Sequence, residues 1–332
     1  MAFSADNASR EIDVTAMGEL LIDFTQNGYS SAGNPILEAN PGGAPCNVLA
    51  MLTNLGKKCA FIGKVGKDTF GDMLEDTLKE VGIGTKGLKR DEIVHTTLAF
   101  VHTAPDGDRS FSFYRNPGAD INLDASEVDE ELIKGCKIFH FGSLSLTDEP
   151  CRSATVKALD IAKNAGCIIS FDPNLRESLW ADLKQAKEQI AWGLGKCDIL
   201  KISDNEVIFM TGEEDFDKAA EILLEKYPNI KLLNITAGGN GSFSYYKGMK
   251  VREAGVHVED VIETTGAGDT FCGCVLNYVL EHGLDDLTES DLHDMLRFAN
   301  SAAAVIIRRK GALKVMPTPD EIKCKKDLLT IQ

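Results

Sequence analysis

The sequence predicts an α/β fold with a doubly wound, mostly parallel sheet and helices on both faces. Short apolar segments typical of buried strands alternate along the chain with longer segments that have helical spacing. Most of these strands end in polar residues or glycine, and ligands of open α/β sheets bind at that edge. With 332 residues, 43% of them hydrophobic, the chain can form one large α/β domain or two smaller ones.

The first part of the chain opens with a short strand at 12–17 and an apolar segment at 18–23. Asp23 ends that segment, where a ligand-binding residue would stand, although a turn-forming aspartate is the commoner case. A further strand at 58–65 and a helix at 70–81 continue the alternation.

Two glycines open the first helix. Gly42 and Gly43 follow a strand at 35–40 and precede Asn47, in the first turns of a helix that ends near residue 55. Glycines let a ligand approach the backbone, and an asparagine offers both a donor and an acceptor. A neutral ligand with many hydroxyls would suit these residues; the alternative is a plain strand-to-helix turn.

A hairpin interrupts the strand–helix alternation. Residues 97–103 and 109–115 alternate with period two around the turn formers at 105–108. A hairpin outside the main sheet is a candidate lid that excludes water from a transfer reaction, and the alternative is a small structural flap. Arg115, at its base, is a candidate contact for an anion or a sugar hydroxyl, and a solvated arginine is the equal alternative.

The alternation then resumes to the end of the core. Strands are expected at 137–141, 167–171, 198–202, 232–236 and 255–262, and helices at 150–165, 183–194, 203–211, 271–280 and 292–306. The last helix is rich in small residues, which allow close packing against a neighbouring helix or a flat ring such as adenine.

The glycine turn between the strand at 255–262 and the next helix organises the candidate site. Gly266, Ala267 and Gly268 leave the backbone accessible, and free N–H groups at a helix start favour an anion. Asp269 then stands where a phosphate would arrive. A carboxylate there is repelled unless it has a task, such as removing a proton from an attacking hydroxyl. The alternative is an ordinary N-cap aspartate.

The composition narrows the classes of partner. A net charge of −16 gives no general attraction for nucleic acid or an anionic membrane, so phosphates must be bound by local backbone dipoles. Nine cysteines without metal-site spacing fit a reducing compartment. No apolar signal segment or membrane-length run is found, so a cytoplasmic protein is expected.

Two motifs together resemble a known family. Thr264-Thr-Gly-Ala-Gly-Asp269 and Pro41-Gly-Gly-Ala-Pro-Cys-Asn47 resemble the two signatures of the ribokinase-like (PfkB) carbohydrate kinases. The resemblance extends from about residue 13 to 319 and is strongest to the fructokinase members, through segments 18–24, 116–120 and 149–153. It implies one ribokinase-like domain at 12–322, with lid strands from about 18–40 and 97–115 and a C-terminal tail at 323–332.

The resemblance also implies a reaction: transfer of the ATP γ-phosphoryl group to the 6-hydroxymethyl of D-fructose, with Mg²⁺. Asp269 would be the base, and Gly266, Ala267 and Gly268 the anion hole. The sugar would contact Asp23, Gly42, Gly43, Asn47, Arg115 and Arg176. ATP would contact Lys201, Glu206, Thr236, Gly238, Gly241, Asn300 and Ala303. Glu206 would hold Mg²⁺ through water, and Glu263 and Thr265 are candidates for a monovalent-cation site, such as one for K⁺. A homodimer through the lid is also implied.

Alternatives and departures remain. The alternative acceptors are 2-keto-3-deoxygluconate, another ketose or a nucleoside, and a further alternative is a non-catalytic sugar-binding regulator. A dinucleotide dehydrogenase lacks support, because the first strand does not lead to a GxGxxG turn. Glu263 stands where the family usually has Asp, which puts K⁺ activation in doubt, and Ser203 stands where many relatives have Asn.

Overall fold

The computed structural model describes residues 9–103 and 109–323. Within them the main sheet has nine strands, in the order β13-β12-β11-β10-β9-β8-β1-β4-β5. Their bounds are β1 (Ile12–Met17), β4 (Cys59–Gly66), β5 (Ile83–Asp91), β8 (Cys136–Gly142), β9 (Ile168–Asp172), β10 (Ile199–Ser203), β11 (Leu232–Thr236), β12 (Ser242–Tyr246) and β13 (Met249–Glu253). Neighbours pair in parallel, except that β12 is antiparallel to both β11 and β13. This is the mostly parallel, doubly wound sheet that the sequence predicts.

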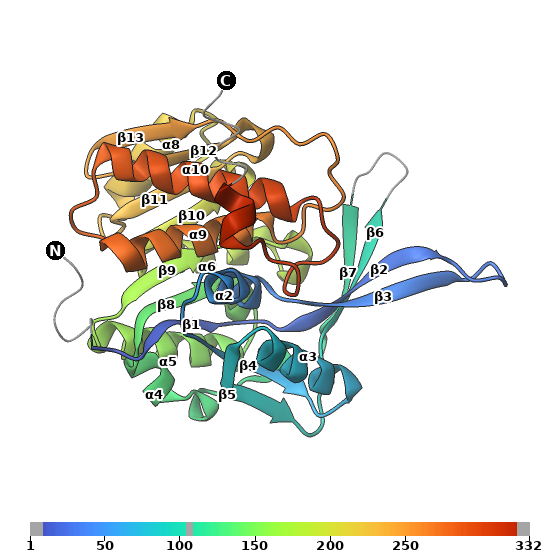
Figure 1. The fold of residues 1–332 in the computed structure, drawn as a ribbon. Coiled ribbons are helices and arrows are strands. Elements are labelled where there is room, and N and C mark those ends of the chain that lie inside the picture. Colours follow the sequence, from blue (N-terminus) through green and yellow to red (C-terminus); the bar gives the residue numbers. More distant parts are fainter. Residues whose placement is uncertain (1–8, 104–108, 324–332) are drawn as a thin grey trace.

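Helices cover both faces of this sheet (Figure 1). One face carries α2 (Ala44–Asn54), α3 (Thr69–Glu80), α9 (Ala267–His282) and α10 (Glu289–Ile306). The other carries α4 (Glu130–Lys134), α5 (Cys151–Asn164), α6 (Leu183–Leu194), α7 (Asp204–Thr211) and α8 (Phe216–Lys226). Each face has its own apolar core, because alternate residues of the strands point to opposite sides. In β1, Val14 and Ala16 join the core under α2 and α9, whereas Met17 joins the opposite one.

A second, four-stranded sheet stands beside the carboxyl edge of the main one. It contains β2 (Leu21–Tyr29), β3 (Pro35–Gly42), β6 (Leu98–Thr103) and β7 (Arg109–Tyr114), in the order β3-β2-β6-β7. Figure 1 shows β2 and β3 running out from the body as a long ribbon, with β6 and β7 beside its base. The predicted hairpin is confirmed for its two strands, and its tip at 105–108 lies outside the described residues.

One predicted strand is wrong. Residues 255–262 form no strand, and the edge position of the sheet belongs to β13 instead. The apolar pattern misled because Val261 and Ile262 are 49% and 54% exposed, so their spacing reflects no buried face. The segment is instead tied to the end of α10, where the N–H groups of Ile262 and Glu263 both donate to the carbonyl of Ile307.

Several strands and helices have no counterpart in the sequence-based expectations: β5, β12, β13, α4 and α8. The expected domain limits, 12–322, stay a prediction. The expected tail lies outside the described residues except for Lys323. In the parts of the chain that the structure describes, no helix combines the length and apolarity needed to cross a membrane.

Candidate active site

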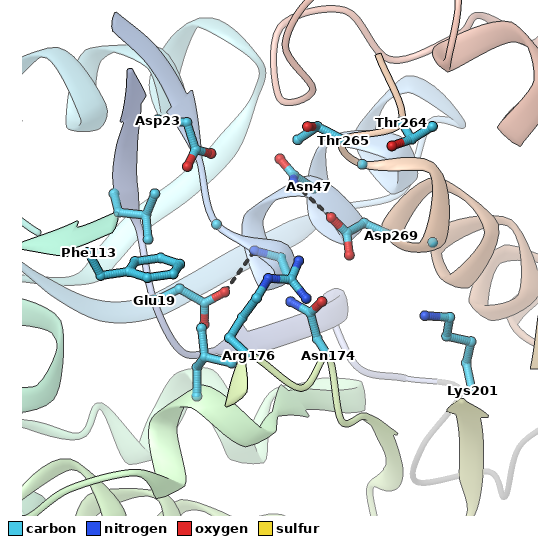
Figure 2. A pocket seen from close by; sticks show the side chains of 16 residues that line it. Glu19, Asp23, Asn47, Phe113, Asn174, Arg176, Lys201, Thr264, Thr265 and Asp269 are labelled. Atoms are coloured by element: carbon cyan, nitrogen blue, oxygen red, sulfur yellow. Dashed lines mark hydrogen bonds between the residues drawn. The ribbon is translucent and has the colours of Figure 1, made fainter. Parts of the chain in front are cut away.

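A cavity of about 400 Å³ opens where the second sheet meets the first turns of α2 and α9 (Figure 2). Its walls come from segments far apart in sequence: the β1–β2 connection, β2, β7, the loop after β9 and the start of α9. They are Glu19, Leu21, Asp23, Gly43, Ala44, Asn47, Phe113, Leu144, Asn174, Arg176, Lys201, Thr264, Thr265, Gly266, Gly268 and Asp269.

The glycine turn begins α9 as the sequence predicts. Gly266 is the N-cap and has φ of 78°, in the left-handed region that favours glycine. A Cβ at this position would lie 2.7 Å from the Cβ of Ala312, so the turn has room only for hydrogen. Because Gly266 occupies the cap, Asp269 lies inside the first turn and the N-cap alternative for Asp269 is wrong.

Asp269 is held by a side chain from the other glycine motif. The Nδ2 group of Asn47, on α2, donates to Oδ2 of Asp269 over 2.8 Å (Figure 2). Burial raises the pKa of Asp269, while the Asn47 hydrogen bond and the positive charges of Lys201 and Arg176 oppose that rise. Two segments 222 residues apart therefore fix one carboxyl group, whose proton affinity is increased by its dry surroundings.

The second glycine motif packs its backbone against two other acidic residues. A Cβ on Gly42 would lie 2.4 Å from Oδ2 of Asp23, and a Cβ on Gly43 would lie 2.4 Å from the carbonyl oxygen of Glu19. Gly43 also has φ of 129°, which an L side chain rarely adopts. Both glycines are therefore required by close approach, and Gly43 lines the cavity while Gly42 lies behind Asp23.

Asp23 and Arg176 face the same cavity. Burial raises the pKa of Asp23 to about 7, the charge of Arg176 lowers it, and the carboxylates of Glu263 and Asp269 raise it further. The predicted sugar contacts Asp23, Gly43, Asn47 and Arg176 are thus brought together. Phe113 on β7 adds an apolar wall from the second sheet.

Arg115 is not among the cavity residues. Its guanidinium is buried, donates to Asp120 through Nε over 2.7 Å, and binds Thr147 and the carbonyl of Leu144. Since all its contacts are inside the protein, Arg115 fixes the segment that carries Leu144 rather than facing the space where a ligand would lie.

Lys201 stands on the side of the cavity opposite Glu19 (Figure 2). Its Nζ contacts both carboxylate oxygens of Asp172, at 3.1 and 3.0 Å. Burial alone would lower the pKa of Lys201, but the carboxylates of Asp172 and Glu206 raise it above its ordinary value, so the ammonium stays charged. A Cβ on Gly268 would lie 2.9 Å from this Nζ, which places the lysine directly beside the start of α9.

A second cavity, of about 240 Å³, adjoins the first and shares Thr264 and Gly268 with it. Five of the seven residues predicted to contact ATP line it: Thr236, Gly238, Gly241, Asn300 and Ala303. Asn300 is fixed by the protein, because Oδ1 accepts from Ser242 and Nδ2 donates to the carbonyl of Ala254. The segment wrongly predicted as a strand supplies Gly255 and Val256 to the wall.

A third cavity, of about 350 Å³, shares Asn174, Arg176 and Lys201 with the first. Glu206, at the start of α7, lines it. Its carboxylate accepts the N–H of Leu175 over 2.7 Å and that of Ser203 over 2.8 Å. These two bonds hold the side chain in one orientation while its remaining lone pairs stay available to a hydrated cation.

Glu263 and Thr265 contact one another. Oγ1 of Thr265 donates to Oε1 of Glu263 over 2.6 Å, and the N–H of Gly311 donates to Oε2 over 2.9 Å. The extra methylene of Glu263 thus allows its carboxylate to bridge the glycine turn and the loop after α10. Each of the two carboxylate oxygens accepts a hydrogen bond inside the protein.

Sequence reasoning missed seven residues of the first cavity. Five of them lie within motifs that were recognised or next to them, and Phe113 lies within the predicted hairpin, but nothing in a linear pattern shows which way they face; the five are Leu21, Ala44, Leu144, Asn174 and Thr264. Glu19 carried a readable signal, since a carboxylate inside an apolar strand-end segment is costly to bury.

Comparison with known proteins gives concordant results. The pfkB family carbohydrate kinase model matches residues 11–319. A probable fructokinase-2 of Arabidopsis thaliana is 43% identical over 321 residues, covering 96% of this chain and 97% of the relative. The structure of a fructokinase with bound ATP from Xylella fastidiosa superposes with a TM-score of 0.86 at 29% identity, over 96% of this chain and 99% of that one. A fructokinase from Vibrio cholerae O395, in a form with fructose, ADP and calcium ion bound, gives 0.84 at 29% identity, over 95% and 98%.

Proposed function

Because this chain belongs to the pfkB family of carbohydrate kinases, we propose that it is an ATP-dependent fructokinase that phosphorylates the 6-hydroxymethyl of D-fructose. One observation carries the proposal. Asp269 and the glycine turn that begins α9 stand at the junction of a polar cavity suited to a sugar and a glycine-lined cavity suited to a nucleotide.

The acceptor sugar occupies the first cavity in this proposal. Asp23 and Asn47 bind its hydroxyls, Gly43 lets it approach the backbone, and Gly42 leaves room for the side chain of Asp23. Asp269 accepts the proton of the attacking hydroxyl as the new O–P bond forms and the bond from phosphorus to the ADP oxygen breaks. The raised pKa of Asp269 suits this role, because a carboxylate with increased proton affinity is a better base.

The transferred phosphoryl group lies over the start of α9. The N–H of Ala267 donates to the carbonyl of Thr264 over 3.3 Å, so in this proposal the N–H of Gly268, in the first helical turn, acts with the helix dipole to stabilise the negative charge on the phosphoryl oxygens. Lys201 adds a fixed positive charge on the same side. In an acidic protein these local groups do what overall charge cannot.

The nucleotide occupies the second cavity, with its base and ribose between Thr236, Gly238 and Gly241 on one side and Asn300 and Ala303 on the other. Mg²⁺ fits the third cavity, because the fixed carboxylate of Glu206 offers the oxygen ligands that hard cations prefer, directly or through water. When bound, the ion neutralises charge on the phosphates of ATP.

A monovalent cation, such as K⁺, is assigned to Glu263 and Thr265. Their side chains bring a carboxylate and a hydroxyl oxygen together, with Oγ1 of Thr265 donating to Oε1 of Glu263, and they lie directly before the glycine turn. Turnover in potassium chloride, compared with the same ionic strength of a bulky organic cation, tests this assignment. Equal rates in the two salts would remove it.

The second sheet is proposed to act as the lid of the sugar cavity and as the contact of a homodimer. It contributes Phe113 to the cavity wall and exposes apolar side chains, with Tyr29 68% and Tyr114 67% exposed. Light scattering coupled to size exclusion would give the mass of a dimer; a monomer at micromolar concentration would contradict the contact. The cytoplasmic location expected from the sequence stays a prediction.

An acceptor panel tests the proposed function. The purified chain with ATP and Mg²⁺ is given D-fructose, 2-keto-3-deoxygluconate, another ketose and a nucleoside, and the products are identified by phosphorus NMR. We expect the largest kcat/KM for fructose, with fructose 6-phosphate as product. A higher kcat/KM for another acceptor would replace fructose as the substrate, and no turnover on any of them would favour a sugar-binding regulator.

A further inference from the structure

Glu19 is a buried carboxylate that the proposed reaction does not use. It lies in the connection between β1 and β2, is 4% exposed, and lines the first cavity together with Asp23 and Asp269. It belongs to neither of the two glycine motifs. A carboxylate is costly to bury unless its oxygens find donors, so its position in the wall of a ligand cavity requires an explanation.

A hydrogen bond within the protein stabilises one of the two oxygens of the Glu19 carboxylate. Oε1 of Glu19 accepts the N–H of Ala44 over 2.9 Å (Figure 2). The N-cap of α2 is Gly43, which has no side chain to accept that N–H, so Glu19 serves the helix start from another segment. Among the side chains that the structure describes, those of residues 9–101 and 112–323, none donates a hydrogen bond to the Glu19 carboxylate, which therefore has capacity for a donor from the cavity.

The charges around the cavity indicate which donor fits. Three carboxyl side chains, Glu19, Asp23 and Asp269, line it, against the two cations Arg176 and Lys201. Lys201 lies across the cavity from Glu19 (Figure 2), and its ammonium group contacts the carboxylate of Asp172. The hydroxyls of a neutral sugar can donate hydrogen bonds to these carboxylates. A sugar acid instead brings a further negative charge beside them, which is repelled.

We propose that Glu19 is a specificity-determining residue that accepts a hydrogen bond from a hydroxyl of the acceptor sugar and disfavours sugar acids through its charge. The inference rests on the proposed function and refines its acceptor to a neutral polyhydroxylated sugar. Burial raises the pKa of Glu19 to about 7, against the opposing effects of its own backbone N–H, the Ala44 N–H and the charge of Arg115, so an assay near pH 8.5 keeps the carboxylate charged.

The test compares wild type with Glu19→Gln at about pH 8.5, with ATP and either D-fructose or 2-keto-3-deoxygluconate as acceptor. Glutamine keeps the shape and the oxygen that accepts the Ala44 N–H, so a role confined to the start of α2 would leave the kinetics unchanged. The matched control is Glu188→Gln, which removes an exposed carboxylate on α6.

We expect Glu19→Gln to raise KM for fructose about tenfold, equivalent to about 1.4 kcal/mol, with kcat within about twofold of wild type. The ratio of kcat/KM for fructose to that for the sugar acid should fall at least about tenfold, while Glu188→Gln behaves as wild type. A wild-type KM and ratio in Glu19→Gln would overturn the proposal.

The wild-type ratio is a second test that does not depend on the folding of a variant. A wild type that prefers the sugar acid overturns the role of Glu19 in charge selection, whichever acceptor is the natural one. A wild type that phosphorylates other neutral acceptors but not fructose contradicts the proposed fructokinase activity alone, and the ratio is then read with the best neutral acceptor.

Discussion

The hydrogen bond from Asn47 to Asp269 should set the pH at which the enzyme loses activity in acid. Replacing Asn47 by alanine removes a 2.8 Å bond to the ionised form of a buried carboxyl group. Hydrogen bonds to charged groups contribute about 1.5–3 kcal/mol, and one pKa unit corresponds to about 1.36 kcal/mol. The variant should therefore raise the pKa of Asp269 by roughly one to two units.

The sign of the effect follows from the role of the base. Asp269 accepts a proton only when ionised, so kcat falls as the pH drops through its pKa in the ternary complex. In Asn47→Ala the acidic limb of the kcat profile should move to higher pH by that amount. The assay is kcat at saturating ATP and sugar from about pH 5 to 9, which separates the shift from any rise in KM for the sugar.

A matched control is Asn164→Ala, which removes an exposed asparagine at the end of α5 and should leave the profile unchanged. The reasoning is refuted if Asn47→Ala shows the wild-type acidic limb while remaining folded. In that case either Asp269 is not the group whose ionisation limits turnover, or Asn47 does not stabilise its charged form.

Two further predictions concern the other cavities. Gly241→Ala introduces a Cβ 2.0 Å from the carbonyl oxygen of Glu253, at a residue whose φ is 92°, so the wall of the second cavity must shift. We expect KM for ATP to rise about tenfold, equivalent to about 1.4 kcal/mol, and KM for fructose to stay unchanged. Gly212→Ala, also at positive φ but with nothing within 4 Å of its Cβ, is the control, and equal effects of the two on KM for ATP would contradict the account. Lys201→Met leaves the buried carboxylate of Asp172 without its cation and should lower the free energy of unfolding by about 3–5 kcal/mol in denaturant titrations, with part of the loss recovered when Asp172→Leu is added. An unchanged unfolding midpoint in Lys201→Met would show that the pair is not stabilising.

The main sheet was predictable where strands are buried on both faces. The segments at 137–141, 167–171, 198–202 and 232–236 are short, apolar and followed by polar residues or glycine, and each is a strand in the structure. The strands at the β13 edge of the sheet were harder to predict from the sequence. β12 and β13 are antiparallel strands with mixed faces, and the exposed Val261 and Ile262 mimicked a strand that does not exist.

The glycine motifs of the site were readable because glycine is required there for steric reasons that hold in any context. Gly43, Gly241 and Gly266 have positive φ and leave no space for a Cβ. The sequence does not predict in the same way which groups the charged side chains contact. Arg115 has the same chemistry whether it faces a ligand or a buried Asp120, and only the fold decides that it binds Asp120.

Glu19 is an intermediate case, because the sequence indicates that it is buried but not which group it contacts. Its position in an apolar segment signals a buried carboxylate, but its contact with Ala44, 25 residues away, depends on the path of the chain through the second sheet. Sequence patterns therefore located the loops that form the site, and the structure was needed to decide which side chains on them face the cavity.

The most direct measurement of the central claim is the turnover of Asp269→Asn. The substitution keeps the shape of the side chain but removes its ability to take a proton. We predict that calorimetry gives fructose and ATP dissociation constants within a few-fold of wild type while kcat falls by about 10²–10⁴. A kcat close to that of wild type, with binding intact, would contradict the assignment of Asp269 as the base.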